Sequence, residues 1–261
     1  MTDQGGSHGV SRRRVLRQGL AGAGAFAVAP LAGVVGPLAV GGGPPPIITR
    51  TQWGADESLR GHGPDFAPIR RAIVHHTVTP INEPDPAGRV RAIYRYHVVN
   101  RRWSDIAYNF LVDGAGRIYE GRWARSYGPG EVHDGEDGGG RGVIGSHARG
   151  HNTGSLGIAV LGTYTHGHTG PTDAALGAVA LLVAWKLGPR GIDPRAPGAF
   201  VGHRDVTSTG CPGDGVHQRL PELRDRAAAL AGGGATGGGG LLDELLGLVL
   251  ETPRLPLLGG S

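Results

Sequence analysis

Short apolar runs bounded by Gly, Asp or Asn recur through the middle of the chain. Four of these runs are rich in residues that favour extended backbone, and they predict strands at residues 72–78, 106–112, 117–120 and 156–161. The sequence Asp113-Gly114-Ala115-Gly116 lies between the second and third runs and predicts a hairpin turn.

Helical periodicity separates these runs. Val90, Ile93, Tyr94, His97 and Val98 fall on one face of a helix. Two further helices are predicted at residues 172–187 and 221–230, the first with Gly188 and Pro189 as its stop signal. Strands and helices in this order predict an α/β fold, with a central mixed β-sheet flanked by α-helices.

The two ends of the chain differ from this middle part. Residues 1–40 place Arg12, Arg13 and Arg14 ahead of an apolar, Gly/Ala-rich stretch, which is typical of a twin-arginine export signal. A membrane anchor is the alternative, but Gly and Pro dilute the segment below a good spanning helix. Residues 41–46 predict a linker, residues 47–230 a single core domain, and residues 231–261 a glycine linker with a short leucine-rich tail, in which we expect little order.

Charge and cysteine content narrow the possible functions. Of the net charge of +4, three charges belong to the first 39 residues, so the core carries no broad positive surface for nucleic acid. The chain contains one cysteine and therefore no intramolecular disulfide. After signal removal we expect a monomer without a stable membrane span.

Two segments carry residues suited to a metal. His75 and His76 end an apolar strand, and neighbours on a strand point to opposite faces, so only one of them can face a given site. His203 and Cys211 lie eight positions apart in a polar loop. Two imidazoles and one thiolate are good zinc ligands, and they would leave a fourth position for water, as catalytic zinc requires.

A Cys–His nucleophilic pair at Cys211 is the rival chemistry. Pro212 follows this cysteine directly, so one amide that could stabilise a thiolate or an oxyanion is missing. The zinc interpretation also explains why an exported protein would carry a single unpaired thiol, since a metal-bound thiolate is sequestered.

Five motifs in this order resemble a known family. They are Trp53-Gly54-Ala55, residues 73–77, residues 105–110 with 116–122, residues 145–152 with 155–158, and residues 202–212. Together they resemble the zinc-dependent N-acetylmuramoyl-L-alanine amidases that include peptidoglycan recognition proteins and phage lysozyme-type amidases. The resemblance covers about residues 47–230, which is essentially the whole core.

The resemblance implies roles for individual residues. His75, His203 and Cys211 would be the zinc ligands, and Tyr108 and Thr209 would stabilise the developing oxyanion. Substrate contacts would come from residues lining a groove: His76, Trp103, Arg122, His147 and Asn152. Arg122 would pair with a carboxylate of the stem peptide, since Arg binds carboxylates in a bidentate fork. The sequence departs from many animal members here, which carry Gly-Trp where this chain has Arg122-Trp123-Ala124.

The implied activity is hydrolysis of the amide bond between N-acetylmuramic acid and L-alanine in cell-wall peptidoglycan, with Zn2+ as cofactor. The protein would be exported by the twin-arginine pathway and would be secreted or associated with the cell wall. Two alternatives stay open at this point. One is a peptidoglycan-binding module without catalysis, and the other is a structural zinc domain whose groove serves a protein partner.

Overall fold

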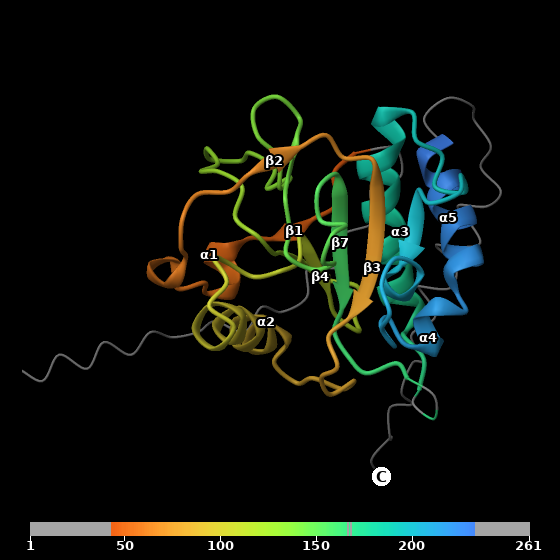
Figure 1. Cartoon of the computed structure of the whole chain (residues 1–261), viewed down its shortest axis with the longest axis horizontal. Coiled ribbons are helices and arrows are strands. Elements are labelled where there is room, and N and C mark those ends of the chain that lie inside the picture. Colours follow the sequence, from red (N-terminus) through yellow and green to blue (C-terminus); the bar gives the residue numbers. More distant parts are fainter. Residues whose placement is uncertain (1–42, 166, 168, 233–261) are drawn as a thin grey trace, which may run out of the picture. The chain divides into compact units, whose positions relative to one another are not determined.

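A mixed sheet of six strands organises the described part of the chain (Figure 1). From edge to edge the strands are β1 (Ile47–Ile48), β5 (Ile118–Glu120), β4 (Phe110–Val112), β7 (Ser155–Val160), β3 (Arg71–His76) and β8 (Phe200–Gly202). Strands β4 and β5 form the predicted antiparallel hairpin, and every other neighbouring pair is parallel.

The computed structural model describes residues 43–165, 167 and 169–232. The predicted export signal at residues 1–40 lies outside the described residues, and so does the predicted tail from residue 233 onward. A membrane-crossing helix would need a longer apolar stretch than any helix in the described ranges provides.

The predicted strands differ from the observed ones mainly in the second run. Of residues 106–112, only Phe110–Val112 are extended in the sheet. At Asn109 the backbone still bonds to Gly157 and Gly121, and the side chain adds two bonds: Oδ1 accepts from the Gly157 amide, and Nδ2 donates to the Val143 carbonyl, both at 2.7 Å. Strand β8 was not predicted, since it is only three residues long and ends in Gly202.

The helices follow their predicted positions closely. Helix α3 (Asp173–Leu187) begins after Thr172, whose side chain accepts from the Ala175 amide, and α5 spans Leu220–Gly232. Helix α2 (Pro86–Arg95) begins before the predicted positions 90–98 and ends within them, because the chain continues from residue 96 as a π-helical turn, η2 (Tyr96–Asn100). The short helices α1 (Arg50–Trp53) and α4 (Asp214–His217) were not predicted.

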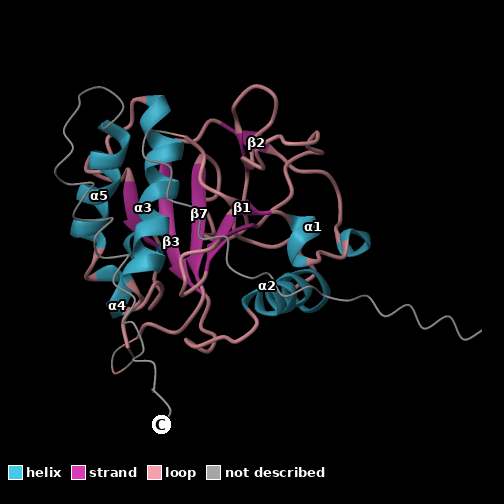
Figure 2. Ribbon diagram, turned by 180° about the vertical axis from the view of Figure 1, so that it is seen from behind, coloured by secondary structure: helices cyan, strands magenta, loops and turns pink. Residues whose placement is uncertain are grey.

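Helices cover both faces of the sheet, as expected. Helices α3 and α5 pack on one face (Figure 2), where Val74, Phe110 and Ile158 join their apolar side chains in the main core. On the other face a second core gathers residues of α1, α2, β4 and β5, among them Trp53, Tyr94, Leu111 and Tyr119. Because β3 alternates between these faces, Val74 faces α3, whereas Ile73 and His75 face the opposite side.

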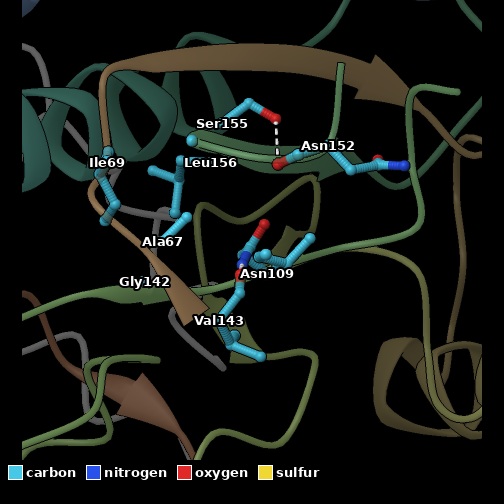
Figure 3. A pocket seen from close by; sticks show the side chains of 10 residues that line it. Ala67, Ile69, Asn109, Gly142, Val143, Asn152, Ser155 and Leu156 are labelled. Atoms are coloured by element: carbon cyan, nitrogen blue, oxygen red, sulfur yellow. Dashed lines mark hydrogen bonds between the residues drawn. The ribbon is translucent and has the colours of Figure 1, made fainter. Parts of the chain in front are cut away.

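A second, two-stranded sheet pairs β2 (Phe66–Ala67) with β6 (Gly142–Val143). Between this sheet and the start of β7 lies a small hollow lined in part by Asn109, Asn152 and Ser155 (Figure 3). The hollow is too narrow to admit a water molecule, so it is a packing feature of the fold.

Candidate metal centre

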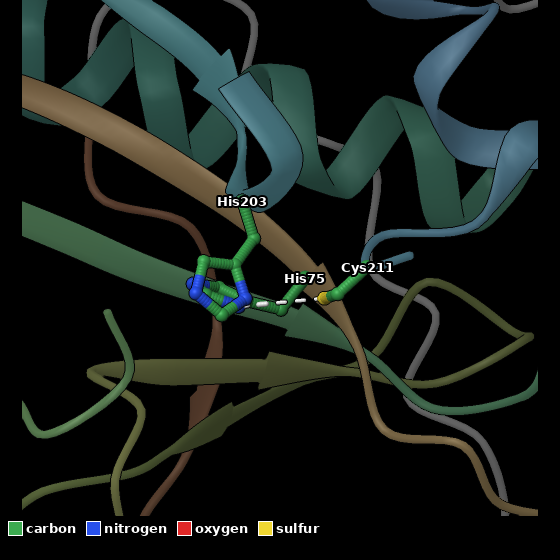
Figure 4. Close-up of side chains that lie close together, drawn as sticks. All are labelled: His75, His203 and Cys211. Atoms are coloured by element: carbon green, nitrogen blue, oxygen red, sulfur yellow. Dashed lines mark hydrogen bonds between the residues drawn. The ribbon is translucent and has the colours of Figure 1, made fainter. Parts of the chain in front are cut away.

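Three side chains from distant parts of the sequence meet at the carboxyl end of β3 (Figure 4). His75 projects from β3 and is only 1% exposed. Strand β8 pairs with β3 in parallel, with Val74 opposite Gly202, so the chain leaving β8 emerges beside His75. His203 begins the short turn η4 (His203–Asp205), and Cys211 follows in the next loop.

The three donor atoms lie close enough to share one ion. One nitrogen of each imidazole and the Cys211 sulfur all lie within 4.8 Å of one another. His75 Nδ1 is 3.6 Å from Cys211 Sγ, and the His75 and His203 ring centroids are 4.4 Å apart. Within the described ranges no other group of three His, Cys, Asp or Glu side chains comes together in this way. Two imidazole nitrogens and one sulfur form a donor set that suits zinc.

Burial keeps both histidines neutral. It lowers the pKa of His75 well below its usual range, and the neighbouring His147 and His203 add to the effect. Burial also lowers the pKa of His203, with a further contribution from His151. A neutral imidazole has a free lone pair, which a metal ligand needs.

The Cys211 thiol is not activated by its surroundings alone. Burial raises its pKa to about 11, against the opposing influence of the His76 backbone and the charge of Arg204. A reactive cysteine needs a lowered pKa, so this environment disfavours the Cys–His nucleophilic pair. A metal ion would instead stabilise the thiolate.

Arg204 holds the loop between the two later donors. Its backbone amide donates to the Cys211 carbonyl at 2.8 Å, and its Nη1 donates to Asp214 Oδ1 at 2.6 Å. Its Nη2 donates to the Gly210 carbonyl. Thr209 is exposed in the same loop, and its Oγ1 accepts from the Cys211 amide at 3.3 Å.

Tyr108 lies beside the cluster. Its ring centroid is 5.3 Å from that of His75. Burial raises the pKa of the Tyr108 phenol above its usual range, and Cys211 adds to this shift, so the group stays protonated and can donate. The Arg122 amide donates to the Tyr108 carbonyl at 2.8 Å, which fixes the backbone at this residue.

The comparisons with known proteins identify the family of the chain. A family model described as N-acetylmuramoyl-L-alanine amidase matches residues 65–214, more than half of the chain. The chain belongs to this amidase family. Peptidoglycan-recognition protein 1 of Holotrichia diomphalia is 32% identical over 183 residues, which cover 67% of this chain and 79% of the relative.

Human N-acetylmuramoyl-L-alanine amidase is 33% identical over 183 residues, which cover 68% of this chain and 28% of the relative. The chain thus spans little more than a quarter of that longer protein. Among solved structures, peptidoglycan recognition protein-LE in complex with tracheal cytotoxin superimposes with a TM-score of 0.54 at 27% identity, covering 67% of this chain and 92% of that one.

In this member of the amidase family, a row of aromatic rings leads away from the three donors. The Trp103 ring stacks on His97 at 4.9 Å, and His97 packs edge-on against Tyr108 at 5.8 Å. His97 Nδ1 accepts from the Ala107 amide at 3.2 Å, and burial lowers the pKa of His97 to about 4. The sequence indicated His97 only as a helix-face residue, because nothing in its periodicity signals the π-helical turn.

The other expected substrate contacts lie in three different environments. His147 is 3.0 Å from His75, and Asn152 Oδ1 accepts from the amides of His147 and Ala148 at 2.8 Å each. Arg122 is buried and donates to Ser104, Ser146 and the Ile106 carbonyl. His76 is not brought to the cluster, since it is 4% exposed and its Nδ1 accepts from the Tyr164 amide at 3.2 Å.

Proposed function

We propose that this chain is a zinc-dependent N-acetylmuramoyl-L-alanine amidase that cleaves the amide bond between N-acetylmuramic acid and L-alanine in bacterial peptidoglycan. The convergence of His75, His203 and Cys211 within 4.8 Å carries the proposal. Family membership supports the type of bond, and the likeness to a recognition protein bound to tracheal cytotoxin, a monomeric diaminopimelic acid-type peptidoglycan, supports the substrate class.

These donors would hold zinc, which supplies a Lewis acid for the scissile carbonyl and a nucleophile at neutral pH. Tyr108 is the first candidate to stabilise the developing oxyanion, because its phenol stays protonated beside His75. Thr209 is the second, since its oxygen already accepts from the Cys211 amide while its hydroxyl proton remains free to donate. Loss of one such donor costs on the order of 100- to 1000-fold in rate.

The stem peptide would lie along the aromatic row and the residue 147–152 loop. Trp103 and His97 offer ring surfaces there, and Asn152 shapes the loop through the His147 amide. Arg122 donates to Ser104, Ser146 and the Ile106 carbonyl, all uncharged groups, and it is our candidate to pair with a substrate carboxylate. His76 is buried and its Nδ1 accepts from the Tyr164 amide, so we do not include it among the substrate contacts.

A non-catalytic peptidoglycan-binding module is the second candidate, and the likeness to peptidoglycan recognition proteins favours it. Mass analysis of defined muropeptides after incubation separates the two. The amidase releases free stem peptides beginning with L-alanine, and both chelation and Cys211→Ala abolish release. Binding of the muropeptide without release in the zinc-loaded protein would instead establish the module.

Tyr108→Phe tests the catalytic assignment more finely. The variant should keep its zinc and lose about 100-fold or more in kcat, because only the phenol hydroxyl is removed. An unchanged kcat would remove Tyr108 from the mechanism and leave the metal site standing.

We also propose that the protein acts outside the membrane as a monomer, exported by the twin-arginine pathway and secreted or held at the cell wall. The paired arginines Arg12 and Arg13 ahead of an apolar stretch support this route. Replacing both by Lys should retain the uncleaved protein inside the cell, as fractionation and the mass of the N-terminal peptide would show. Unchanged export of that variant would contradict the twin-arginine route.

A further inference from the structure

We propose that His147 is a positioning residue that accepts a hydrogen bond from His75 and so determines which ring nitrogen of His75 is free to bind the metal. This inference rests on the proposed zinc site. It assigns His147 a role inside the protein, in place of the substrate contact that the sequence suggested.

The two ring nitrogens of His75 have different neighbours. Nδ1 lies 3.6 Å from Cys211 Sγ, on the side where the three donors converge, whereas Nε2 lies 3.0 Å from Nδ1 of His147. A neutral imidazole carries one proton, and the nitrogen that binds a metal must not carry it. His75 therefore has to hold its proton on Nε2, where it can donate to His147.

The hydrogen bonds beyond His147 agree with this direction. If His147 accepts at Nδ1, its own proton lies on Nε2, which is 3.3 Å from Ser155 Oγ. The Ser155 hydroxyl in turn donates to the His151 carbonyl at 2.6 Å. The row thus runs from His75 through His147 to Ser155, whose hydroxyl lies within hydrogen-bond distance of the His151 and Asn152 carbonyls. The reverse direction would place a proton on His75 Nδ1, facing Cys211, and would block the metal site.

The packing around His147 fixes its ring in this position. A Cβ atom at Gly157 would come within 2.3 Å of His147 Cδ2, and one at Gly145 within 2.5 Å, so both glycines leave the space that the ring fills. Asn152 accepts from the His147 amide, and the nearby Ser155 hydroxyl also reaches the Asn152 carbonyl at 3.0 Å (Figure 3). With 8% of its surface exposed, His147 is built into the protein and turned towards His75.

A partner of this kind orients a metal-bound histidine and selects its tautomer. In most metal sites the partner is a carboxylate, a backbone carbonyl or water, and its loss typically costs about 10- to 100-fold in metal affinity or activity. Here the partner is a second imidazole, which can accept at Nδ1 only while it donates from Nε2. Ser155 therefore contributes to the orientation of His75 indirectly, through the two hydrogen bonds that connect it by way of His147.

Two variants of the full chain separate the hydrogen bond from the packing. His147→Ala removes the acceptor, and we expect zinc affinity to fall about 10- to 100-fold in chelator competition. His147→Asn places an amide oxygen where Nδ1 was, and we expect most of the affinity to return. Equal zinc affinity in His147→Ala and wild type would overturn the proposal. Equal weakening in both variants would also overturn it, since the ring's bulk would then be what matters.

Spectra and folding controls complete the test. Thermal unfolding of the metal-free variants shows whether each is folded, and the absorption bands of the Co2+-loaded proteins report the ligand geometry directly. If His147→Ala does not fold, long-range 1H–15N spectra of the zinc-loaded wild type decide the question. We expect a proton on His75 Nε2 and none on His147 Nδ1, and the opposite pattern would refute the proposal.

Failure of the zinc site and failure of the His147 role alone would give different results. A wild-type chain that binds no zinc removes the amidase mechanism and this inference together. A wild-type chain that binds zinc and cleaves muropeptides, beside an unaffected His147→Ala variant, removes this inference alone.

Discussion

The strand and the loop that supply the metal donors are held in place by different means. His75 belongs to β3, which is hydrogen-bonded to β7 on one side and β8 on the other. His203 and Cys211 are partly exposed, and the loop between them is held by local contacts, chiefly those of Arg204 and Asp205. The strand position is thus part of global folding, whereas the loop position is local. Substitutions near β3 should change stability, and substitutions in the loop should change metal affinity.

Ile73→Ala should have the largest effect on the strand side. Ile73 is fully buried in β3, so the substitution should lower the free energy of unfolding by about 2–5 kcal/mol. Chemical denaturation of the metal-free protein measures this loss. Val206→Ala is the matched control, because Val206 is only partly buried against the same small cluster but lies in the loop. Equal losses in the two variants would erase the distinction between strand and loop.

The next largest expected effect is on the pH dependence of stability, and it comes from His76 at the end of β3. Burial lowers the pKa of His76 to about 4, with a further contribution from Arg204. The unfolded chain has a pKa near 6.5, so it binds more protons than the folded chain between about pH 4 and 6.5. The contribution of His76 to the free energy of unfolding is therefore fully present above pH 6.5, and it is lost as the pH drops through this window.

For one such histidine the loss can reach ~3 kcal/mol, because each pKa unit corresponds to about 1.4 kcal/mol. His76→Asn keeps an acceptor for the Tyr164 amide and cannot titrate, so its stability should depend less steeply on pH. Unfolding of the metal-free proteins at a series of pH values measures the two slopes. Identical slopes would show that His76 does not contribute to the acid sensitivity.

Arg204→Ala tests the loop side. Losing its contacts with Asp214 and Gly210 should weaken zinc binding about 10- to 100-fold, while the metal-free protein loses little stability. Arg195→Ala is the control, since Arg195 is exposed and its ion pair within the described residues is with Asp193, two positions away. Chelator competition compares the affinities. A large drop in the stability of the metal-free protein with unchanged zinc affinity would show that Arg204 supports the global fold and not the local position of the loop.

Thr209→Val should have the smallest effect on zinc affinity. It removes the oxygen that accepts from the Cys211 amide but leaves the Arg204 contacts intact, so we expect a loss of less than about tenfold. Ser208→Ala, at the exposed neighbouring position, provides the baseline. The measurement is zinc affinity alone, which keeps it separate from any effect of Thr209 on turnover. A loss as large as that of Arg204→Ala would mean that the turn at Thr209 holds Cys211 more than the arginine does.

The sequence predicted the elements whose signals are local. The predicted strands at residues 72–78 and 156–161 and the predicted helix at residues 172–187 are long apolar stretches with clear boundaries, and the structure contains all of them. Strand β8 was missed because its three residues become a strand only by pairing with β3. Residues 106–109 were wrongly predicted as strand: only Asn109 bonds to a neighbouring strand through its backbone, and its side chain adds bonds to Gly157 and Val143.

The contrast between local signals and tertiary contacts also applies to the metal site. Residue type indicated a metal site that takes His203, Cys211 and one of the pair His75 and His76, and the family resemblance selected His75. The structure brings His75, His203 and Cys211 together. The partners of these residues could not be predicted in this way. The hydrogen bond between His75 and His147 spans 72 positions, and Arg204 reaches Asp214 only because the loop folds back. Such contacts depend on tertiary distances that no local pattern encodes.

Strand β8 lies at the margin of the sheet and is paired along one side only. His203 follows this strand directly and Cys211 lies in the next loop. Local detachment of β8 from β3 would therefore separate these two donors from His75 while the rest of the sheet stays intact. An ion bound there would link side chains 136 positions apart and so hold the segment after β8 against β3. Metal loading should therefore protect the last third of the described chain from proteases far more than it protects the hairpin of β4 and β5.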